Sequence, residues 1–201
     1  MSSSSSLPTG TSADAATQLR ELRRQVDQLA AQLFALSERE AIRDVLRRYV
    51  RGLDRHDVEL ESSAFWPDAQ VNYGRYSGQR DAFVIWGNEG HCAHFLRHEH
   101  HITNQTIDIE GDVAHVESYV IYLLHERDTE FTEIGGARYI DRMERRDGQW
   151  RILLREFLPD IRVRGVSAFD AAFVRQACPP GGAGTWDKSD LSYLRPLRPR
   201  R

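Results

Sequence analysis

The chain has 201 residues, of which 40% are hydrophobic, and its formal net charge is -3 at pH 7. A chain of this length can bury most of its apolar surface in one domain, so folding requires neither a metal ion nor a disulfide. Basic residues alternate with acidic ones through most of the sequence, which argues against a nucleic-acid groove.

The two cysteines, Cys92 and Cys178, lie far apart and form no CxxC pair. This usage indicates neither a disulfide framework nor a zinc knuckle, and it fits a reducing compartment. No apolar run approaches the roughly 18 residues typical of a membrane span, and the N-terminus lacks a signal-peptide core. We therefore expect a soluble cytoplasmic protein without nucleic-acid or membrane partners.

Residues 1–16 consist mostly of Ser, Ala and Thr, with one Gly and one Pro, a composition that predicts a disordered tail. Apolar residues then recur at alternating spacings of three and four, at Leu19, Leu22, Val26, Leu29, Leu33 and Leu36. This heptad seam predicts an amphipathic helix over 17–37. An isolated helix of this length is marginal in water, so the seam needs a partner, either in its own domain or in another subunit.

The motif SERE at 37–40 resembles a capping box and predicts that a second helix begins at Ser37. The expected buried stripe of that helix consists of Ile42, Val45, Leu46, Tyr49, Val50 and Leu53. Asp54 follows Val50 by four residues and shares this side of the helix. An ionised carboxylate is costly there unless it is paired, so Asp54 requires a partner.

The rest of the chain changes from helical to extended patterns. A short helical turn ends at FWPD, a strand is expected at 69–73, and DAFVIW begins another helix. Four long β-branched and aromatic segments follow His98, joined by turn signals at Gly111-Asp112, Asp128-Thr129 and Asp147-Gly148. Helices followed by an antiparallel meander predict an α+β domain over 38–165. The Pro- and Gly-rich remainder, 166–201, is expected to be a C-terminal extension.

Five histidines fall within residues 91–104. His91, His94 and His98 are spaced i, i+3, i+7 and would share one face of a continuous helix, as zinc ligands do. However, two glycines precede them, the extended segment begins soon after His98, and no carboxylate shell accompanies them. We therefore predict no metal site.

In this order, the segments resemble the SnoaL-like branch of the nuclear transport factor 2-like superfamily. The resemblance rests on EAIRDVLRRYVRGLDRHD, FWPDAQV, HHITN and GGARYIDRMERRDGQWRI. It implies an α+β cone, in which helices and a curved antiparallel sheet enclose a deep pocket. The pattern is closest to the lyases with an aspartate and histidine dyad: hexachlorocyclohexane dehydrochlorinase, bile-acid dehydratase and scytalone dehydratase.

The dyad of these lyases matches Asp54 in GLDRHD and His100 at the start of an H-x-x-T-N motif. Tyr49 and Arg155 match a tyrosine and an arginine found in some members. The dehydrochlorinase has a lysine where Tyr49 stands, so the resemblance is better to a dehydratase. Alternation along the strand places His100, Ile102 and Asn104 on one face, but only the resemblance indicates that this face meets the pocket.

The roles of the other candidate residues stay open. Arg155 shares a strand face with Leu153 and Phe157, so it is either paired structurally or directed at a substrate oxygen. Tyr49 is either a core aromatic or a general acid. The residues expected to line the pocket are Tyr73, Trp86, Tyr119, Ile121, Tyr139 and Phe157.

The leading hypothesis is a cofactor-independent lyase that eliminates water from a hydrophobic small molecule, such as a cyclic polyketide or a steroid. His100 would remove a carbon-bound proton, because imidazole exchanges protons near neutral pH, and Asp54 would fix its tautomer. Tyr49 and Arg155 would assist the departing hydroxyl or an adjacent carbonyl. The alternatives are an isomerase or polyketide cyclase with the same dyad, or a non-catalytic ligand-binding or assembly subunit. The resemblance also favours a homo-oligomer, and specifically a trimer.

Overall fold

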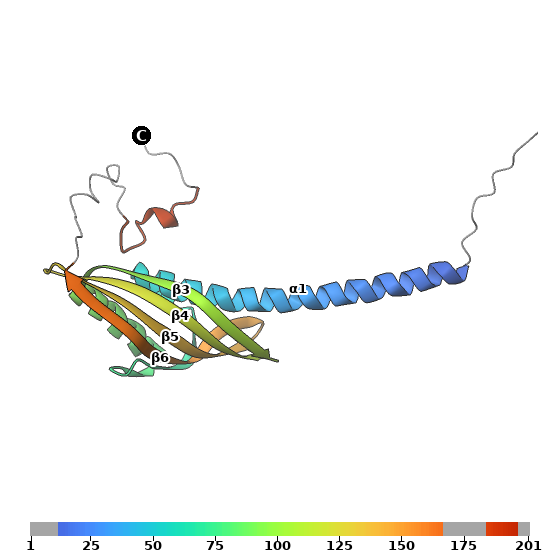
Figure 1. Cartoon of the computed structure of the whole chain (residues 1–201), viewed down its shortest axis with the longest axis horizontal. Helices are drawn as coiled ribbons and strands as arrows, with labels where there is room; N and C mark the ends of the chain where they lie inside the picture. The colour runs from blue at the N-terminus through green and yellow to red at the C-terminus, as the bar shows by residue number, and fades with distance from the viewer. Residues whose placement is uncertain (1–11, 167–183, 197–201) are drawn as a thin grey trace, which may run out of the picture. The chain divides into compact units, whose positions relative to one another are not determined.

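The computed structural model describes residues 12–166 and 184–196, and Figure 1 shows the course of the chain. The elements in order are α1 (Ser12–Asp54), α2 (Val58–Ser62), β1 (Phe65–Asn72), β2 (Ser77–Gln79), α3 (Arg80–His94), β3 (Phe95–Glu110), β4 (Val113–Glu126), β5 (Phe131–Arg146), β6 (Gln149–Val166) and η1 (Leu191–Tyr193). The chain divides into two compact units, Met1–Ala41 and Ile42–Arg201, which are described in turn. Cys178 and the ends of the chain lie outside the described residues.

The N-terminal helix is longer than the sequence predicts. α1 begins at Ser12, so the prediction of disorder is wrong for residues 12–16, whereas residues 1–11 lie outside the description. The predicted capping box is also wrong, because α1 continues through Ser37, whose hydroxyl donates to the carbonyl of Phe34 at 2.8 Å. Neither glycine nor proline interrupts the sequence from Ser12 to Arg51, and an interior serine can satisfy its hydroxyl on the preceding turn.

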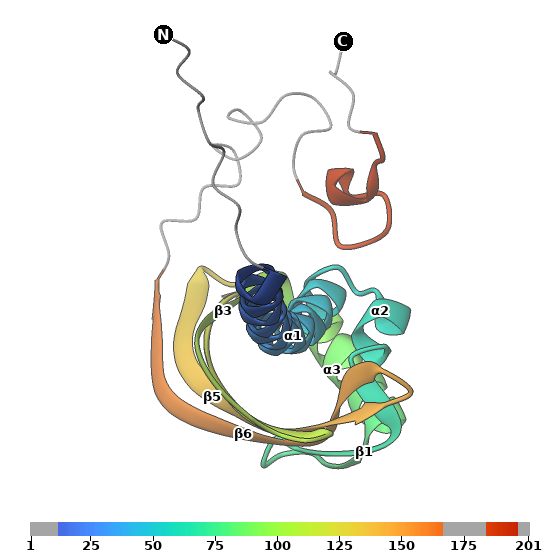
Figure 2. The ribbon, with the colours of Figure 1, turned by 90° about the vertical axis from the view of Figure 1, so that its right-hand side faces the viewer.

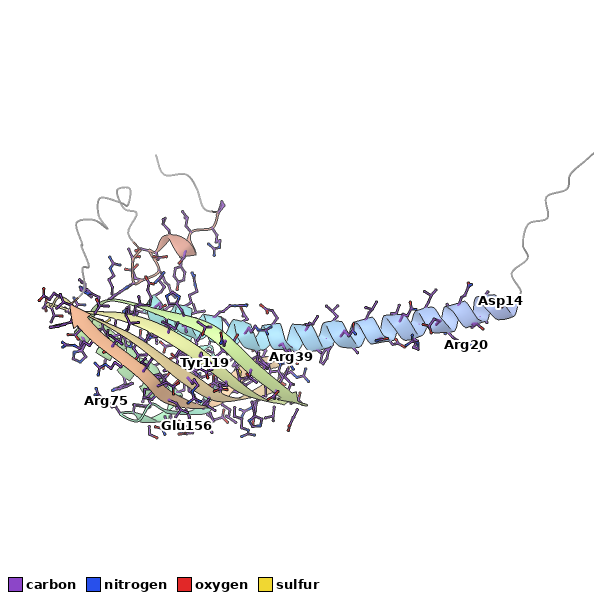
Figure 3. All side chains as sticks on the ribbon, in the orientation of Figure 1. Asp14, Arg20, Arg39, Arg75, Tyr119 and Glu156 are labelled. Carbon is purple, nitrogen blue, oxygen red and sulfur yellow. The ribbon has the colours of Figure 1, made fainter. Side chains whose placement is uncertain are left out.

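The heptad seam of the first unit is exposed along its whole length. Its six apolar residues have exposed fractions between 51% and 68%: Leu19, Leu22, Val26, Leu29, Leu33 and Leu36. Figure 3 shows the polar side chains of Asp14 and Arg20 projecting from the same part of α1. An apolar row of this spacing is typical of a helix that packs against a second helix.

The second unit contains one six-stranded sheet in the order β2-β1-β6-β5-β4-β3. The strands β3 to β6 form the predicted antiparallel meander, which confirms this part of the expected α+β fold. β1 pairs in parallel with β6, and the short strand β2, which the sequence did not indicate, pairs antiparallel with β1. Figure 2 shows that the sheet is strongly curved and that α2 and α3 lie along its concave side.

The core of the second unit lies between the sheet and the last turns of α1. The buried residues Ile42, Val45, Leu46, Tyr49 and Leu53 pack in one cluster with residues of the sheet, as the helical spacing predicts. Positive φ angles occur at Gly111, Asp128, Asp147 and Gly148, in the three turns that the sequence predicts. Among the described helices, none has the length and apolar character that a membrane span requires.

The histidine-rich segment changes conformation earlier than predicted. α3 ends at His94 and β3 begins at Phe95, so His98 lies on a strand instead of a helix. The pairing of β3 with β4 shifts between Ile102 and Gln105. Because this bulge adds a residue, Gln105 is half-buried and Asn104 is exposed, contrary to the simple alternation expected from the sequence.

We propose that the exposed seam joins two or more copies of the chain. Replacing Leu22 and Leu29 with lysine should then lower the molar mass measured by multi-angle light scattering at micromolar concentration, because charges in a seam oppose packing. The matched control replaces Gln28 and Ala31, on the opposite side of the helix, with lysine and should keep the parental mass. A monomeric parent, or an unchanged mass in the leucine variant, would contradict the proposal.

Candidate active site

Asp54, the last residue of α1, meets His100 from β3 within the second unit. Asp54 Oδ1 lies 2.7 Å from His100 Nδ1, and Asp54 Oδ2 accepts the backbone N–H of His100 at 3.0 Å. The two side chains are largely buried, with exposed fractions of 15% and 7%. Since the carboxylate only accepts, the neutral imidazole carries its proton on Nδ1 and keeps the lone pair of Nε2.

The end of α1 explains why Asp54 needs two donors. The free carbonyl groups at a helix C-terminus disfavour a negative charge. The chain also turns sharply here: the carbonyl of Gly52 accepts the N–H groups of Arg55 and Asp57, and His56 has a φ of 48°. The donors of His100 compensate the carboxylate and join the end of α1 to β3.

His100 lines a cavity of about 630 Å³, whereas Asp54 is not part of its wall. The imidazole therefore lies between the cavity and the carboxylate. The residues of the wall include the predicted Tyr49, Tyr73, Trp86, Tyr139 and Phe157, together with Leu53, Glu61, Phe83, His91, Phe95, Tyr122 and Leu124. A largely apolar wall with a few polar groups is typical of a small-molecule site.

The expectation that Tyr119 and Ile121 line the cavity is wrong. Both residues are exposed, at 46% and 44%, whereas their neighbours Ser118 and Val120 are buried. Successive side chains of a strand point to opposite faces, so Tyr119 and Ile121 lie on the other face of β4. Figure 3 labels Tyr119 on this strand. The sequence indicated aromatic and β-branched character but not the face.

Two tyrosines from different elements share a hydrogen bond in the cavity wall. The hydroxyl oxygens of Tyr49 and Tyr73 are 2.8 Å apart, and the ring of Tyr73 stacks on Phe157 with centroids 4.6 Å apart. Burial raises the pKa of both tyrosines, so both hydroxyls stay protonated. One hydroxyl donates to the other, which leaves one proton for a further acceptor.

Arg155 is paired with a carboxylate, which is one of the two interpretations that the sequence left open. Its Nε and Nη2 each donate to Asp141 at 2.7 Å, and both side chains are fully buried. Arg155 is not part of the cavity wall. Its guanidinium lies 4.3 Å and 4.1 Å from the ring centroids of Tyr49 and Tyr139. Arg155 thus supports the aromatic wall from behind through a charge–ring contact.

His91 of the cavity wall and His98 behind it have defined tautomers. Burial lowers the pKa of His91 and of His98 to about 3, so both rings are neutral near pH 7. His98 Nε2 donates to the carbonyl of Leu53 at 3.2 Å, so His98 Nδ1 accepts from His91 Nδ1, 3.0 Å away. His91 Nε2 is consequently an unprotonated acceptor. Within residues 12–166 and 184–196, no group of three or more His, Cys, Asp or Glu side chains is arranged to hold a metal ion.

Glu61 is a polar residue of the cavity wall that the sequence did not indicate. It lies on α2, its exposed fraction is 1%, and Asn88 of α3 donates to its Oε2 at 2.7 Å. Burial raises the pKa of Glu61 to about 8. Nothing in the local sequence VELES distinguishes Glu61 from the exposed Glu59, because only the packing of α2 separates them.

The raised pKa of Glu61 predicts a pH-dependent stability. Between the reference pKa of 4.5 and the folded value of about 8, the folded state binds a proton that the unfolded chain has lost. The contribution of Glu61 to the free energy of unfolding should therefore fall as pH rises through this window. Since one pKa unit corresponds to ~1.4 kcal/mol, the expected decrease is a few kcal/mol.

Glu61→Gln removes this titration, so its melting temperature relative to the parent should rise with pH across the same window. The lowered pKa values of His91 and His98 change stability with pH in the opposite direction. Because the parent and the variant share both histidines, the difference between their melting temperatures reports the titration of Glu61. Glu59→Gln should follow the parental pH profile. A constant difference between Glu61→Gln and the parent would contradict a raised pKa.

Comparisons with known proteins concern the family and the fold of the chain. The family model of the SnoaL-like domain matches residues 35–156, more than half of the chain. No curated protein sequence matches significantly. Among solved structures, a candidate scytalone dehydratase from Novosphingobium aromaticivorans is 24% identical, with a TM-score of 0.59 over 68% of this chain and 92% of its own.

Two further structures are similar. Hexachlorocyclohexane dehydrochlorinase LinA-type3 from Novosphingobium barchaimii is 20% identical, with a TM-score of 0.64 over 70% of this chain and 98% of its own. Rv3472 of Mycobacterium tuberculosis, a protein of unknown function, is 26% identical, with a TM-score of 0.55 over 62% and 77% of the two chains. The family match establishes that the chain belongs to the SnoaL-like family, and the similar structures show the same fold.

Proposed function

We propose that this protein is a lyase of the dehydratase type, which eliminates water from a hydrophobic small molecule in the cavity. The observation that carries the proposal is the position of His100, whose Nδ1 is held by Asp54 while its ring lines the cavity. An imidazole held in this tautomer presents an unprotonated Nε2, as a general base requires. Asp54 stabilises the imidazolium that forms when His100 accepts the proton.

The proposed reaction begins with removal of a proton from a carbon next to a carbonyl group. Negative charge then develops on the carbonyl oxygen, and the shared hydroxyls of Tyr49 and Tyr73 supply a donor for it. Loss of the hydroxyl from the adjacent carbon forms the double bond and completes the elimination. Arg155 has a positioning role here, because its guanidinium packs against the ring of Tyr49 without entering the cavity.

The cavity wall supports a cyclic, hydrophobic substrate. Tyr73, Phe83, Trp86 and Phe157 supply aromatic surface, and the ring of Tyr73 is in stacking or tilted contact with those of Phe83 and Phe157. A cavity of about 630 Å³ falls within the ~300–1,000 Å³ range of small-molecule sites. A substrate with a single ring or two fused rings and a β-hydroxy ketone group fits both the apolar wall and the polar groups of the cavity.

The names of two similar structures support elimination chemistry. One is described as a candidate scytalone dehydratase, and the other as a hexachlorocyclohexane dehydrochlorinase. These relatives are distant, so the substrate of this protein is a separate proposal. An isomerase or cyclase would use the same base, but its product would keep the mass of the substrate, whereas elimination lowers the mass by one water.

The dyad makes a direct prediction for an elimination assay. Cyclic β-hydroxy ketones, with scytalone among them, serve as substrates, and mass spectrometry follows the loss of water. His100→Ala should reduce kcat/KM by ~100- to 10,000-fold, the range for a positioned base. Asp54→Asn should also cause a large loss, because one amide cannot accept from both the ring and the backbone N–H of His100. The double variant should lose little more than the worse single variant.

Asp44→Asn is the matched control, because Asp44 is an exposed carboxylate on the same helix. It should keep parental activity, and thermal melts should show that all variants are folded. Parental activity in a folded His100→Ala variant would remove the dyad from the mechanism. A product with the mass of the substrate would replace the lyase proposal with an isomerase or a cyclase.

A further inference from the structure

The position of Glu61 depends on a close contact between two helices. A Cβ atom at Gly52 of α1 would clash with the backbone nitrogen of Glu61, so only glycine permits α2 to pack this closely. As a result, Glu61 lies in the wall of the cavity that His100 also lines. The two groups reach the cavity from different elements, α2 and β3.

The hydrogen bonds around Asn88 determine which oxygen of Glu61 accepts. Asn88 Nδ2 lies 2.9 Å from the carbonyl of Val84 and 2.7 Å from Glu61 Oε2. A backbone carbonyl can only accept, so the Asn88 atom facing it must be the NH₂ group, which then also donates to Glu61 Oε2. Asn88 Oδ1 correspondingly accepts from His56 Nδ1 at 2.9 Å. Asn88 is therefore locked in one orientation.

The other oxygen, Glu61 Oε1, is buried and has no hydrogen-bond partner among the described residues. When the carboxyl group is neutral, its proton belongs on Oε1, because Oε2 already accepts from Asn88. Burial is the largest cause that raises the pKa of Glu61, and the charge of Asp54 raises it further, whereas Asn88 and Arg155 act in the opposite direction. With a pKa of about 8, the group is mostly protonated at neutral pH.

We propose that Glu61 is the general acid of this site and donates the Oε1 proton to the hydroxyl group that leaves the substrate. The inference rests on the proposed elimination. His100 takes the proton from the α-carbon, the C–H electron pair forms the C=C bond, and the C–O bond at the β-carbon breaks. The leaving oxygen takes the proton of Glu61 and departs as water. Solvent then returns a proton to Glu61 and removes one from His100.

Glu61 suits this step better than the tyrosines of the wall. Hydroxide is a poor leaving group, so the acid must release its proton readily as the C–O bond breaks. Burial holds the pKa of Tyr49 well above 10, whereas that of Glu61 is about 8, which is nearer to the working pH. The hydroxyls of Tyr49 and Tyr73 instead suit hydrogen bonding to the carbonyl oxygen, where no proton transfer is needed.

The test compares two leaving groups on one ring skeleton, a cyclic β-hydroxy ketone and its β-acetoxy ester. Acetate leaves without protonation, whereas hydroxide needs an acid. Glu61→Gln keeps the shape and the contact with Asn88 but has no acidic proton. Its kcat/KM should fall by ~100- to 10,000-fold for the hydroxy ketone and by a few-fold at most for the acetoxy ester. Glu59→Gln, the exposed neighbour on α2, should leave both rates unchanged.

The pH profile gives a second readout that a purely structural role would not change. The parental rate with the hydroxy ketone should fall above about pH 8 as Glu61 ionises, and the rate with the acetoxy ester should lack this decrease. Equal losses for both substrates in Glu61→Gln, or parental activity of this variant with the hydroxy ketone, would overturn the role of Glu61 but not the proposed elimination. A parent that turns over neither substrate would reject the proposed elimination, and the role of Glu61 with it.

Discussion

The two hydrogen bonds from His100 to Asp54 are the constraint on which the candidate site depends. A carboxylate at the C-terminal end of a buried helical stripe is unfavourable by itself, both because of burial and because of the helix dipole. By donating its ring and backbone N–H groups, His100 compensates this charge and joins α1 to β3. The same contact orients the imidazole toward the cavity, so one interaction serves both the fold and the proposed chemistry.

Around this pair, burial shifts the pKa values of the carboxyl group and the imidazoles in opposite directions. The pKa of Glu61 is raised and those of His91 and His98 are lowered, in each case chiefly because burial disfavours the charged form. The site therefore combines a neutral carboxylic acid with neutral imidazoles at the same pH. Arg155 keeps its charge because Asp141 pairs with it away from the cavity. Such separation of acids from bases is what a proton-transfer site needs.

Local chemistry was sufficient to predict most of the second unit. Turn residues with positive φ and long β-branched segments indicated the meander, and the cost of burying Asp54 indicated a polar partner. The capping box at Ser37 failed, because its sequence is equally compatible with the interior of a long helix. The parallel pairing of β1 with β6 depends on contacts distant in sequence, which periodicity does not report.

Only part of the candidate site could be predicted from the sequence pattern and the family resemblance. Periodicity identified the strand of His100, and the family resemblance identified its face. For Tyr119 and Ile121 neither source fixed the face, and they lie on the exposed side of β4. Glu61 could not be distinguished from Glu59 because its burial arises from the packing of α2 on α1. Gly52 was the available signal, since a glycine near the end of an otherwise uninterrupted helix suggests a close approach of another backbone.

The proposed chemistry requires that Asp54 holds His100 with its proton on Nδ1 and a free lone pair on Nε2. Nitrogen-15 NMR of the histidine side chains at neutral pH, with His100 assigned by substitution, measures this tautomer directly. We expect a pyrrole-type Nδ1 and a pyridine-type Nε2 for His100 in the parent, and loss of this preference in Asp54→Asn. A parental His100 protonated on Nε2, or a tautomer that does not depend on Asp54, would contradict it.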